Sequence, residues 1–283
     1  RGYYGIPYNN LNAYGDEVLR YLRRYDVDYV DVRDVFRDAD MKAKDIFYHT
    51  DHHWTVPSAF YATGKIIDHL NQKFEANLDP DGYYRDLNNY TIETYSHIYM
   101  GSQGRDAGLI YSRRLDDYSF LYPKFATNYH YYSRYKGGKE ANKDGPIDRT
   151  LIDRKYLDYA DPYDREMNNS YLQGVVRFDQ IDNKLNPNGP TALFIRDSYS
   201  SPVATFLSPM FSRIELLWSL HFSPTGDGSI QKMLEKKHFD YVFVALALDN
   251  FTNEGTPFYT DDPKAAENGD ADVAAQGQDP AAH

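Results

Sequence analysis

The sequence predicts an α/β fold in which a parallel β-sheet is flanked by helices. Strand-like and helix-like segments alternate along residues 191–248, a helix pattern precedes a strand pattern near the start, and 41% of the 283 residues are hydrophobic. A chain of this length can bury a sizeable core. We predict one α/β domain over residues 1–260, with an irregular Tyr-rich, β-containing insertion at about 75–185 and a low-complexity tail over 261–283.

The first quarter of the chain predicts a helix, a strand and a second helix. Apolar residues recur at helical spacing over residues 10–25, whereas residues 27–32 alternate apolar and acidic side chains like a half-buried strand. The second helix is predicted over residues 56–74, because Thr55 or Ser58 can cap its first turn.

Periodicity is weak over residues 75–184, where Tyr, Asp, Asn and Arg are frequent. Short apolar pieces at 91–99, 109–111 and 118–122 indicate a few antiparallel strands within irregular structure. Residues 136–148 are rich in Gly, Lys and Asp and predict an exposed loop.

The C-terminal half of the domain shows the regular alternation that suggests the fold. Strands are predicted over 191–196, 213–218 and 241–248, and helices over 200–211 and 229–238. This order is typical of βαβ units with right-handed crossovers and a parallel sheet.

Composition limits the classes of function and partner. A formal net charge of −11 argues against binding to a phosphate backbone, so no nucleic-acid partner is expected. The chain has no Cys, which excludes disulfides, thiolate metal sites and Cys nucleophiles. No apolar run is long enough to span a membrane. Because the sequence begins at Arg1, we expect that a signal or anchor segment has been removed and that the protein is extracytoplasmic.

Ser198 follows a predicted strand and precedes a predicted helix. A serine at the carboxyl end of a central strand lies in the sheet crevice beside helix amides, which is where a nucleophile is needed. The alternative is that Asp197, Ser198 and Ser200 only cap the helix.

A second group of polar residues is the run Asp51-His52-His53-Trp54. In an extended segment Asp51 and His53 point to the same side, so the carboxylate can hold the imidazole in the tautomer that accepts a proton from a serine. The alternatives are a metal site or a structural loop in which Trp54 fills the core and the histidines bind carbonyls. Together with Ser198, this pair supplies the nucleophile, base and orienting group of acyl transfer.

Two motifs carry a family resemblance. The stretches Tyr48-His49-Thr50-Asp51-His52-His53-Trp54-Thr55 and Ile195-Arg196-Asp197-Ser198-Tyr199-Ser200 are similar to the paired signatures of DHHW proteins. These belong to an SGNH-hydrolase-like group that also contains the alginate O-acetylation proteins. The likeness covers about residues 16–250, with the histidine motif before the serine motif, the reverse of ordinary SGNH hydrolases. It implies an SGNH-like fold, with Ser198 as nucleophile, His53 as general base and Asp51 as its partner.

The chain departs from this family pattern at three places. Arg196 stands where an SGNH serine block has Gly, so we expect a less open oxyanion amide beside Ser198. Residues 218–222 replace a sequence of the Asp-x-Arg-Tyr type found in DHHW proteins. No clear match exists to the Gly and Asn blocks that complete the oxyanion hole, and Gly101 is our candidate for the missing backbone donor.

The resemblance implies an O-acetyltransferase or acetylesterase that acts on a cell-envelope or extracellular polysaccharide of a bacterium. The expected partners are the polysaccharide, or an oligosaccharide of it, and an acetyl-donor membrane protein, and no cofactor or metal is expected. One alternative is an inactive glycan-binding component of an acetylation machinery. A more distant alternative is a manganese-dependent phosphoesterase, because Asp51-His52-His53 also resembles the DHH phosphoesterases.

Overall fold

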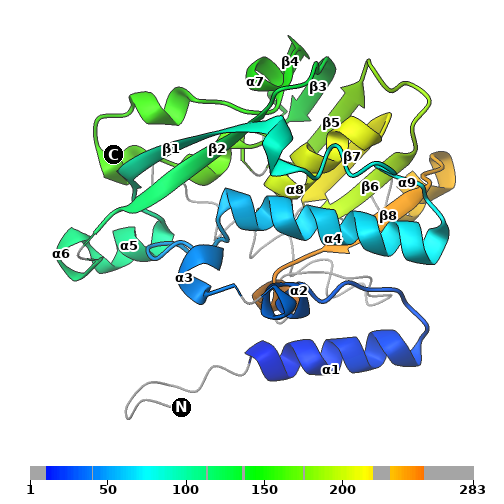
Figure 1. The fold of residues 1–283 in the computed structure, drawn as a ribbon, viewed down its shortest axis with the longest axis horizontal. Helices are drawn as coiled ribbons and strands as arrows, with labels where there is room; N and C mark the ends of the chain where they lie inside the picture. The colour runs from blue at the N-terminus through cyan, green and yellow to red at the C-terminus, as the bar shows by residue number, and fades with distance from the viewer. Residues whose placement is uncertain are drawn as a thin grey trace.

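The computed structural model describes residues 11–39, 41–112, 114–135, 138–174, 176–218 and 230–251. These residues form a six-stranded sheet in the order β4-β3-β5-β7-β6-β8 and a two-stranded ribbon of β1 and β2 (Figure 1). The strands are β1 (Tyr90–Tyr99), β2 (Asp116–Pro123), β3 (Tyr129–Arg134), β4 (Glu140–Gly145), β5 (Phe178–Asn183), β6 (Thr191–Arg196), β7 (Arg213–Trp218) and β8 (Tyr241–Ala245).

Helices connect and cover these strands. The α-helices are α1 (Leu11–Arg24), α2 (Val32–Asp38), α3 (Ala43–Ile46), α4 (Val56–Phe74), α5 (Ser102–Ala107), α6 (Leu109–Ser112), α7 (Ile147–Thr150), α8 (Ser200–Leu207) and α9 (Ile230–Lys236). The 3-10 turns are η1 (Leu87–Asn89), η2 (Lys155–Asp158), η3 (Pro162–Asp164), η4 (Met167–Ser170), η5 (Ser208–Met210) and η7 (Leu248–Phe251).

The sheet is mixed. Strand β6 pairs in parallel with both β7 and β8, while β5 pairs antiparallel with β7 and with β3, and β3 pairs antiparallel with β4. The parallel half has α8 and α9 in its connections, as parallel strands require. The α/β prediction with flanking helices is therefore confirmed, and the predicted parallel sheet is corrected to a mixed one because β3, β4 and β5 add antiparallel pairs.

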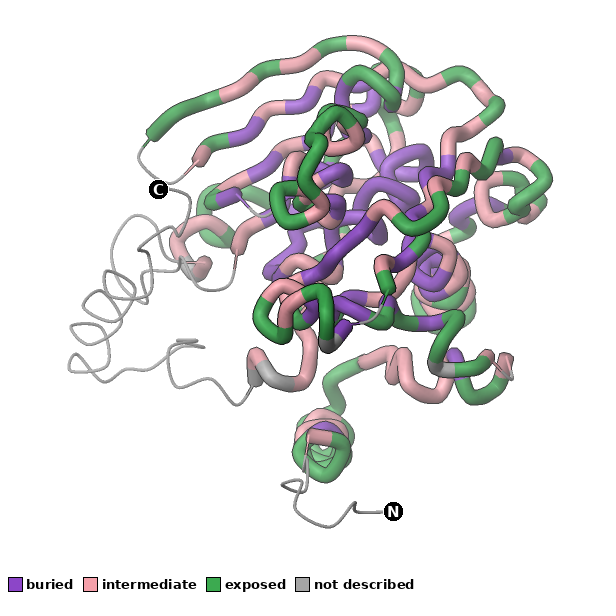
Figure 2. The backbone as a smooth tube through the Cα atoms, turned by 90° about the vertical axis from the view of Figure 1, so that its left-hand side faces the viewer, coloured by how far each residue is buried: buried purple, intermediate pink, exposed green. Residues whose placement is uncertain are grey.

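Helices α4 and α8 pack together over the sheet and form the centre of the core (Figure 1). Every residue of α8 is buried. The rings of Phe60 on α4 and Phe206 on α8 meet edge to face, with centroids 5.1 Å apart. Figure 2 shows the buried residues gathered in the middle of the molecule, whereas α1 lies at its edge and is mostly exposed. This packing connects the two predicted motifs, because α4 begins directly after the histidine motif and α8 begins at the last residue of the serine motif.

The strand predicted over residues 27–32 is wrong. Residues 27–31, all described, connect α1 to α2 without strand pairing, and α2 begins at Val32. The Asp31 side chain accepts a hydrogen bond from Arg33 N (3.0 Å) and caps α2. Asp31, which the alternation assigns to the exposed face of a strand, is thus a helix cap.

Three other segments also differ from prediction. The piece at 109–111 lies in helix α6, and the C-terminal strand ends at Ala245 rather than at residue 248. The predicted loop at 136–148 contains β4, an edge strand made of polar residues. Such an edge strand carries no apolar alternation, so hydrophobic periodicity misses it.

Two predicted segments fall outside the described residues: the tail at 261–283 and, from residue 219 onward, the stretch 218–222. Among the helices that the structure describes, none is both long enough and apolar enough to cross a membrane.

Candidate active site

The Asp-His-His run lies in a tight loop that leads into α4. Phe47 and Trp54 form an isolated antiparallel bridge, and Tyr48 N donates to the carbonyl of His53 (3.2 Å). Immediately afterwards, Thr55 caps α4, as the sequence predicts. The loop is therefore closed at its base and fixed to a long helix, which limits the movement of the side chains that it carries.

A buried carboxylate holds the loop from the side of the β1–β2 ribbon. Asp116, the first residue of β2, accepts hydrogen bonds from His49 N (2.9 Å), Thr50 N (2.7 Å) and Thr50 Oγ1 (2.7 Å). These contacts bind the two residues directly before Asp51. No local sequence pattern marks Asp116, because its role depends on a contact between distant segments.

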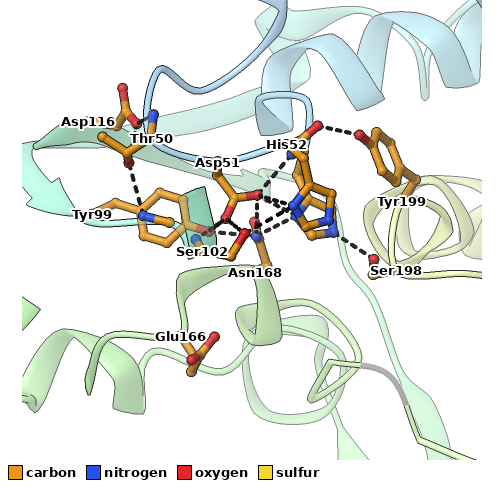
Figure 3. Close-up of polar contacts among 12 residues, drawn as sticks. Thr50, Asp51, His52, Tyr99, Ser102, Asp116, Glu166, Asn168, Ser198 and Tyr199 are labelled. Carbon is orange, nitrogen blue, oxygen red and sulfur yellow. Dashed lines mark hydrogen bonds and ion pairs between the residues drawn. The ribbon is translucent and has the colours of Figure 1, made fainter. Parts of the chain in front are cut away.

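The structure brings Asp51, His53 and Ser198 into one hydrogen-bonded row (Figure 3). His53 Nδ1 lies 2.5 Å from Asp51 Oδ1, and His53 Nε2 lies 2.6 Å from Ser198 Oγ. A carboxylate beside Nδ1 favours the tautomer with its proton on Nδ1, which leaves the Nε2 lone pair facing the serine hydroxyl. The row has the order of nucleophile, base and orienting carboxylate.

Hydrogen-bond donors surround the Asp51 carboxylate. Oδ1 also accepts from His53 N (2.8 Å), and Oδ2 accepts from Tyr99 OH (2.8 Å) and Ser102 N (2.9 Å). Asn168 Nδ2 lies 3.2 Å from Oδ1. Burial alone would raise the pKa of Asp51, but the hydrogen bonds and charge of His53 hold that pKa below its usual range. Asp51 is therefore ionised across the neutral pH range.

His52 and Tyr199 form the outer side of this group. His52 Nδ1 lies 3.1 Å from Ser102 Oγ, and its side chain is 43% exposed. The Tyr199 ring packs against His53, with centroids 4.9 Å apart, and its hydroxyl donates to the backbone carbonyl of His52. The two histidine rings lie side by side, with centroids 4.0 Å apart. Of the two, it is His53 whose Nε2 atom faces Ser198.

Asp197, rather than Ser198, stabilises the turn between β6 and α8. Its carboxylate accepts from Tyr199 N (3.0 Å), Ala247 N (2.5 Å) and Asn250 Nδ2 (2.8 Å). Burial raises the pKa of Asp197, and these donors counteract part of that shift. Asp197 thus accepts the backbone hydrogen bonds of this turn, and the Ser198 hydroxyl contacts His53 instead. The alternative in which Ser198 only caps α8 is therefore not supported.

The Arg196 side chain points away from the site. It is fully buried, forms an ion pair with Asp179 and donates to Ser201 Oγ (3.0 Å). The family pattern, which has Gly in place of Arg196, predicts a less open oxyanion amide beside Ser198. The guanidinium instead joins β6, β5 and α8 beneath the turn, so its bulk does not lie beside the serine hydroxyl.

Gly101 is not placed as an oxyanion donor. Its N–H donates to Thr50 Oγ1 (2.9 Å) and is already engaged. A Cβ at this position would lie 2.1 Å from Asp51 Cβ. Glycine is therefore required for the close approach of the Asp51 loop, and the predicted role is corrected on this ground.

The residues present do not suit a metal centre. Ligand atoms of Asp51, His52 and His53 lie within 4.8 Å of one another. However, both Asp51 oxygens accept protein hydrogen bonds, and both His53 ring nitrogens face protein partners. A cation bound here would have to displace these contacts, so the geometry does not favour the manganese phosphoesterase alternative.

Comparison with known protein families agrees with the histidine motif. The model of a family described as "SGNH hydrolase-like domain, acetyltransferase AlgX" matches residues 7–90, a range that contains the histidine motif and ends before Ser198. No curated protein matches the chain.

Solved structures share the fold at low sequence identity. Bacillus cereus PatB1 with a sulfonyl adduct has a TM-score of 0.66 and 16% identity, covering 89% of this chain and 75% of that one. A second Bacillus cereus PatB1 structure has a TM-score of 0.61 and 17% identity, covering 87% and 77%. A DHHW family protein from Eubacterium siraeum has a TM-score of 0.57 and 15% identity, covering 86% and 69%. The resemblance predicted from the two motifs is thus confirmed for the fold.

Proposed function

We propose that this protein is a serine-dependent O-acetyltransferase or acetylesterase that acts on a cell-envelope or extracellular polysaccharide. The observation that carries the proposal is the row in which Asp51 contacts His53 and His53 contacts Ser198. The match to an SGNH hydrolase-like acetyltransferase family supports the reaction class. The polysaccharide, an acetyl-donor membrane protein and an extracytoplasmic location belong to the proposal as well.

The geometry suits a two-step transfer. In the first step Ser198 Oγ bonds to the acetyl carbonyl carbon while its proton passes to His53 Nε2. The bond to the donor oxygen then breaks, and that oxygen leaves with the proton from Nε2. In the second step an acceptor hydroxyl, from a sugar or from water, gives its proton to Nε2 and attacks the acetyl-serine, and Ser198 recovers a proton. Asp51 stays ionised and stabilises the imidazolium.

The proposal is tested with a chromogenic acetyl ester and a sulfonyl fluoride. We expect the wild type to cleave the ester and to gain one sulfonyl adduct on Ser198, whereas Ser198→Ala does neither. Ser200→Ala is the matched control, because Ser200 Oγ bonds the carbonyl of Ala245 and not His53. Undiminished ester cleavage by Ser198→Ala would contradict the assignment.

The glycan-binding alternative predicts a different outcome of the same experiment. An inactive component of an acetylation machinery would bind an oligosaccharide but would show neither turnover nor an adduct. Equilibrium binding of oligosaccharides by the wild type and by Ser198→Ala distinguishes this alternative from an active enzyme.

A further inference from the structure

A carboxamide from a distant segment completes the surroundings of the Asp51–His53 pair. Asn168 lies in η4, 117 positions after Asp51. Its Nδ2 atom lies 3.2 Å from Asp51 Oδ1 and 2.5 Å from Tyr99 OH, both of which can accept its hydrogens (Figure 3). The same atom lies 2.7 Å from His53 Nδ1, which donates its own proton to Asp51 and so is in contact with Asn168 without accepting from it. One side chain therefore touches the carboxylate, the imidazole and the phenol that binds the other carboxylate oxygen.

We infer that Asn168 is a positioning residue that fixes the rotation of the Asp51 carboxylate and thereby the direction of His53. This inference rests on the proposed acyl transfer. A carboxylate rotates easily about its last side-chain bond, so the orientation of Asp51 depends on its partners. Tyr99 and Ser102 hold Oδ2, and Asn168 contacts both Oδ1 and Tyr99 OH.

The segment that carries Asn168 is docked where those other donors arise. Arg165 Nη1 donates to the carbonyl of Ile98 (3.2 Å), next to Tyr99 at the end of β1. Glu166 forms an ion pair with Arg105 (2.7 Å) on α5, the helix that begins with Ser102. The Asp51 oxygens are thus bound by elements that are also joined to each other, which keeps their relative positions constant.

Asn168 differs from a residue that only fills space. It is half-buried, and its carboxamide is directed into the polar group rather than into the apolar core. Its carboxamide contacts Asp51, His53 and Tyr99, whereas the Ser198 hydroxyl faces His53. We therefore expect its loss to lower the rate of the chemical step and to leave binding of the ester unchanged.

The test compares Asn168→Ala and Asn168→Asp with Asn169→Ala in the full chain. Asn169 is the matched control, because it lies in the same turn with its carboxamide against Gly174. With active sites counted by sulfonyl labelling, we expect kcat of Asn168→Ala to fall about 10- to 100-fold at constant KM, since small misplacements of reacting groups have effects of this size. Asn169→Ala should keep the wild-type kcat.

Two further readouts separate positioning from a merely structural role. In Asn168→Asp a second carboxylate lies beside the imidazole and favours the protonated form of the imidazole. As the pH is lowered, this variant should therefore lose activity at a higher pH than the wild type does. In proton NMR, the strongly deshielded signal of a proton between His53 and Asp51 should be present in wild type, Asn169→Ala and Ser198→Ala. It should broaden or disappear in Asn168→Ala.

The outcomes are distinguishable from failure of the proposed function. If Asn168→Ala retains the wild-type kcat and the deshielded signal, the positioning role is overturned. It is also overturned if Asn168→Ala only lowers Tm and the number of labelled sites, and Asn168→Asp keeps the wild-type pH profile. If the wild type itself neither turns over nor labels, acyl transfer fails, and the NMR signal alone decides whether Asn168 orients the pair.

Discussion

His53 Nε2 lies 2.6 Å from Ser198 Oγ, although 145 positions separate the two residues. The contact depends on two helices, because α4 follows the histidine loop and α8 follows the turn that carries Ser198. Their mutual packing, including the contact between Phe60 and Phe206, sets the distance between the two helix starts. The core of the protein therefore aligns the candidate catalytic groups.

Asp51→Asn should abolish most activity while preserving the fold. An amide can donate to Nδ1, which would favour the tautomer with its proton on Nε2 and turn the base into a donor toward Ser198. We expect kcat for acetyl-ester cleavage to fall by about 10³- to 10⁴-fold, as for the loss of this carboxylate in other serine enzymes. Circular dichroism checks that the variant is folded.

Asp51→Asn should also change how the free energy of unfolding depends on pH. The pKa of Asp51 lies below its usual range in the folded protein, so the ionised carboxylate stabilises the fold at neutral pH. The folded state then binds fewer protons than the unfolded chain as the pH falls below about 4. The advantage of wild type over Asp51→Asn in urea unfolding should shrink over that range. A difference in free energy of unfolding that stays constant as the pH falls would contradict this prediction.

Gly101→Ala should disturb the site more than its small size suggests. A Cβ there would lie 2.1 Å from Asp51 Cβ and 2.3 Å from Asp51 Oδ2, so the loop must move. The backbone at Gly101 has φ −75°, which alanine adopts readily, so close approach alone requires the glycine. We expect lower Tm and a large loss of ester cleavage.

Gly64→Ala is the matched control for that substitution. Gly64 lies within α4, and the nearest atom to an added Cβ is Arg85 Cβ at 3.8 Å. Alanine in a helix interior is favoured over glycine by about 0.5–1 kcal/mol, so this variant should be slightly more stable and fully active. Equal behaviour of the two glycine variants would argue against the steric explanation.

Features that depend on neighbouring residues are predicted from the sequence, whereas contacts between distant segments are not. Helix α4 and its Thr55 cap are local features, and both are confirmed. Ser198, Asp51 and His53 belong to short motifs, so residue type and spacing alone marked them as candidates. Asp116 and Asn168 reach the Asp51 loop from positions 66 and 117 residues away, and no local pattern marks them. Hydrophobic periodicity likewise missed β4, because that strand is polar.

Thr55→Ala should weaken the start of α4. Thr55 Oγ1 accepts from Ser58 N (3.3 Å) and donates to the carbonyl of Asp45 (3.1 Å), which joins the helix to α3. Loss of an N-cap costs about 1 kcal/mol, and we expect a decrease of this size in the free energy of unfolding. Thr55→Ser retains the hydroxyl and should therefore keep most of the free energy of unfolding that Thr55→Ala loses. A neutral effect of Thr55→Ala would show that the cap does not limit stability.

Arg196→Met should destabilise the protein in a pH-dependent way. Arg196 and Asp179 form an ion pair in which both side chains are fully buried, and the Tyr131 hydroxyl also contacts Asp179. Removing one member of such a pair costs about 3–5 kcal/mol, because the remaining carboxyl must either stay charged without a partner or bind a proton. Urea unfolding at pH 7 should show a loss of this size.

The pH dependence of this loss follows from Asp179. Burial raises the pKa of Asp179 to about 6 in the wild type, and loss of the Arg196 charge would raise it further. A carboxyl whose folded pKa exceeds its unfolded pKa stabilises the fold at low pH and loses that contribution as the pH rises through the folded pKa. The deficit of Arg196→Met relative to wild type should therefore be smaller at pH 4 than at pH 8. The double variant Arg196→Met with Asp179→Leu removes both charges and should recover part of the lost free energy of unfolding at pH 8. A deficit that depends neither on pH nor on Asp179 would instead show that the loss comes from packing alone.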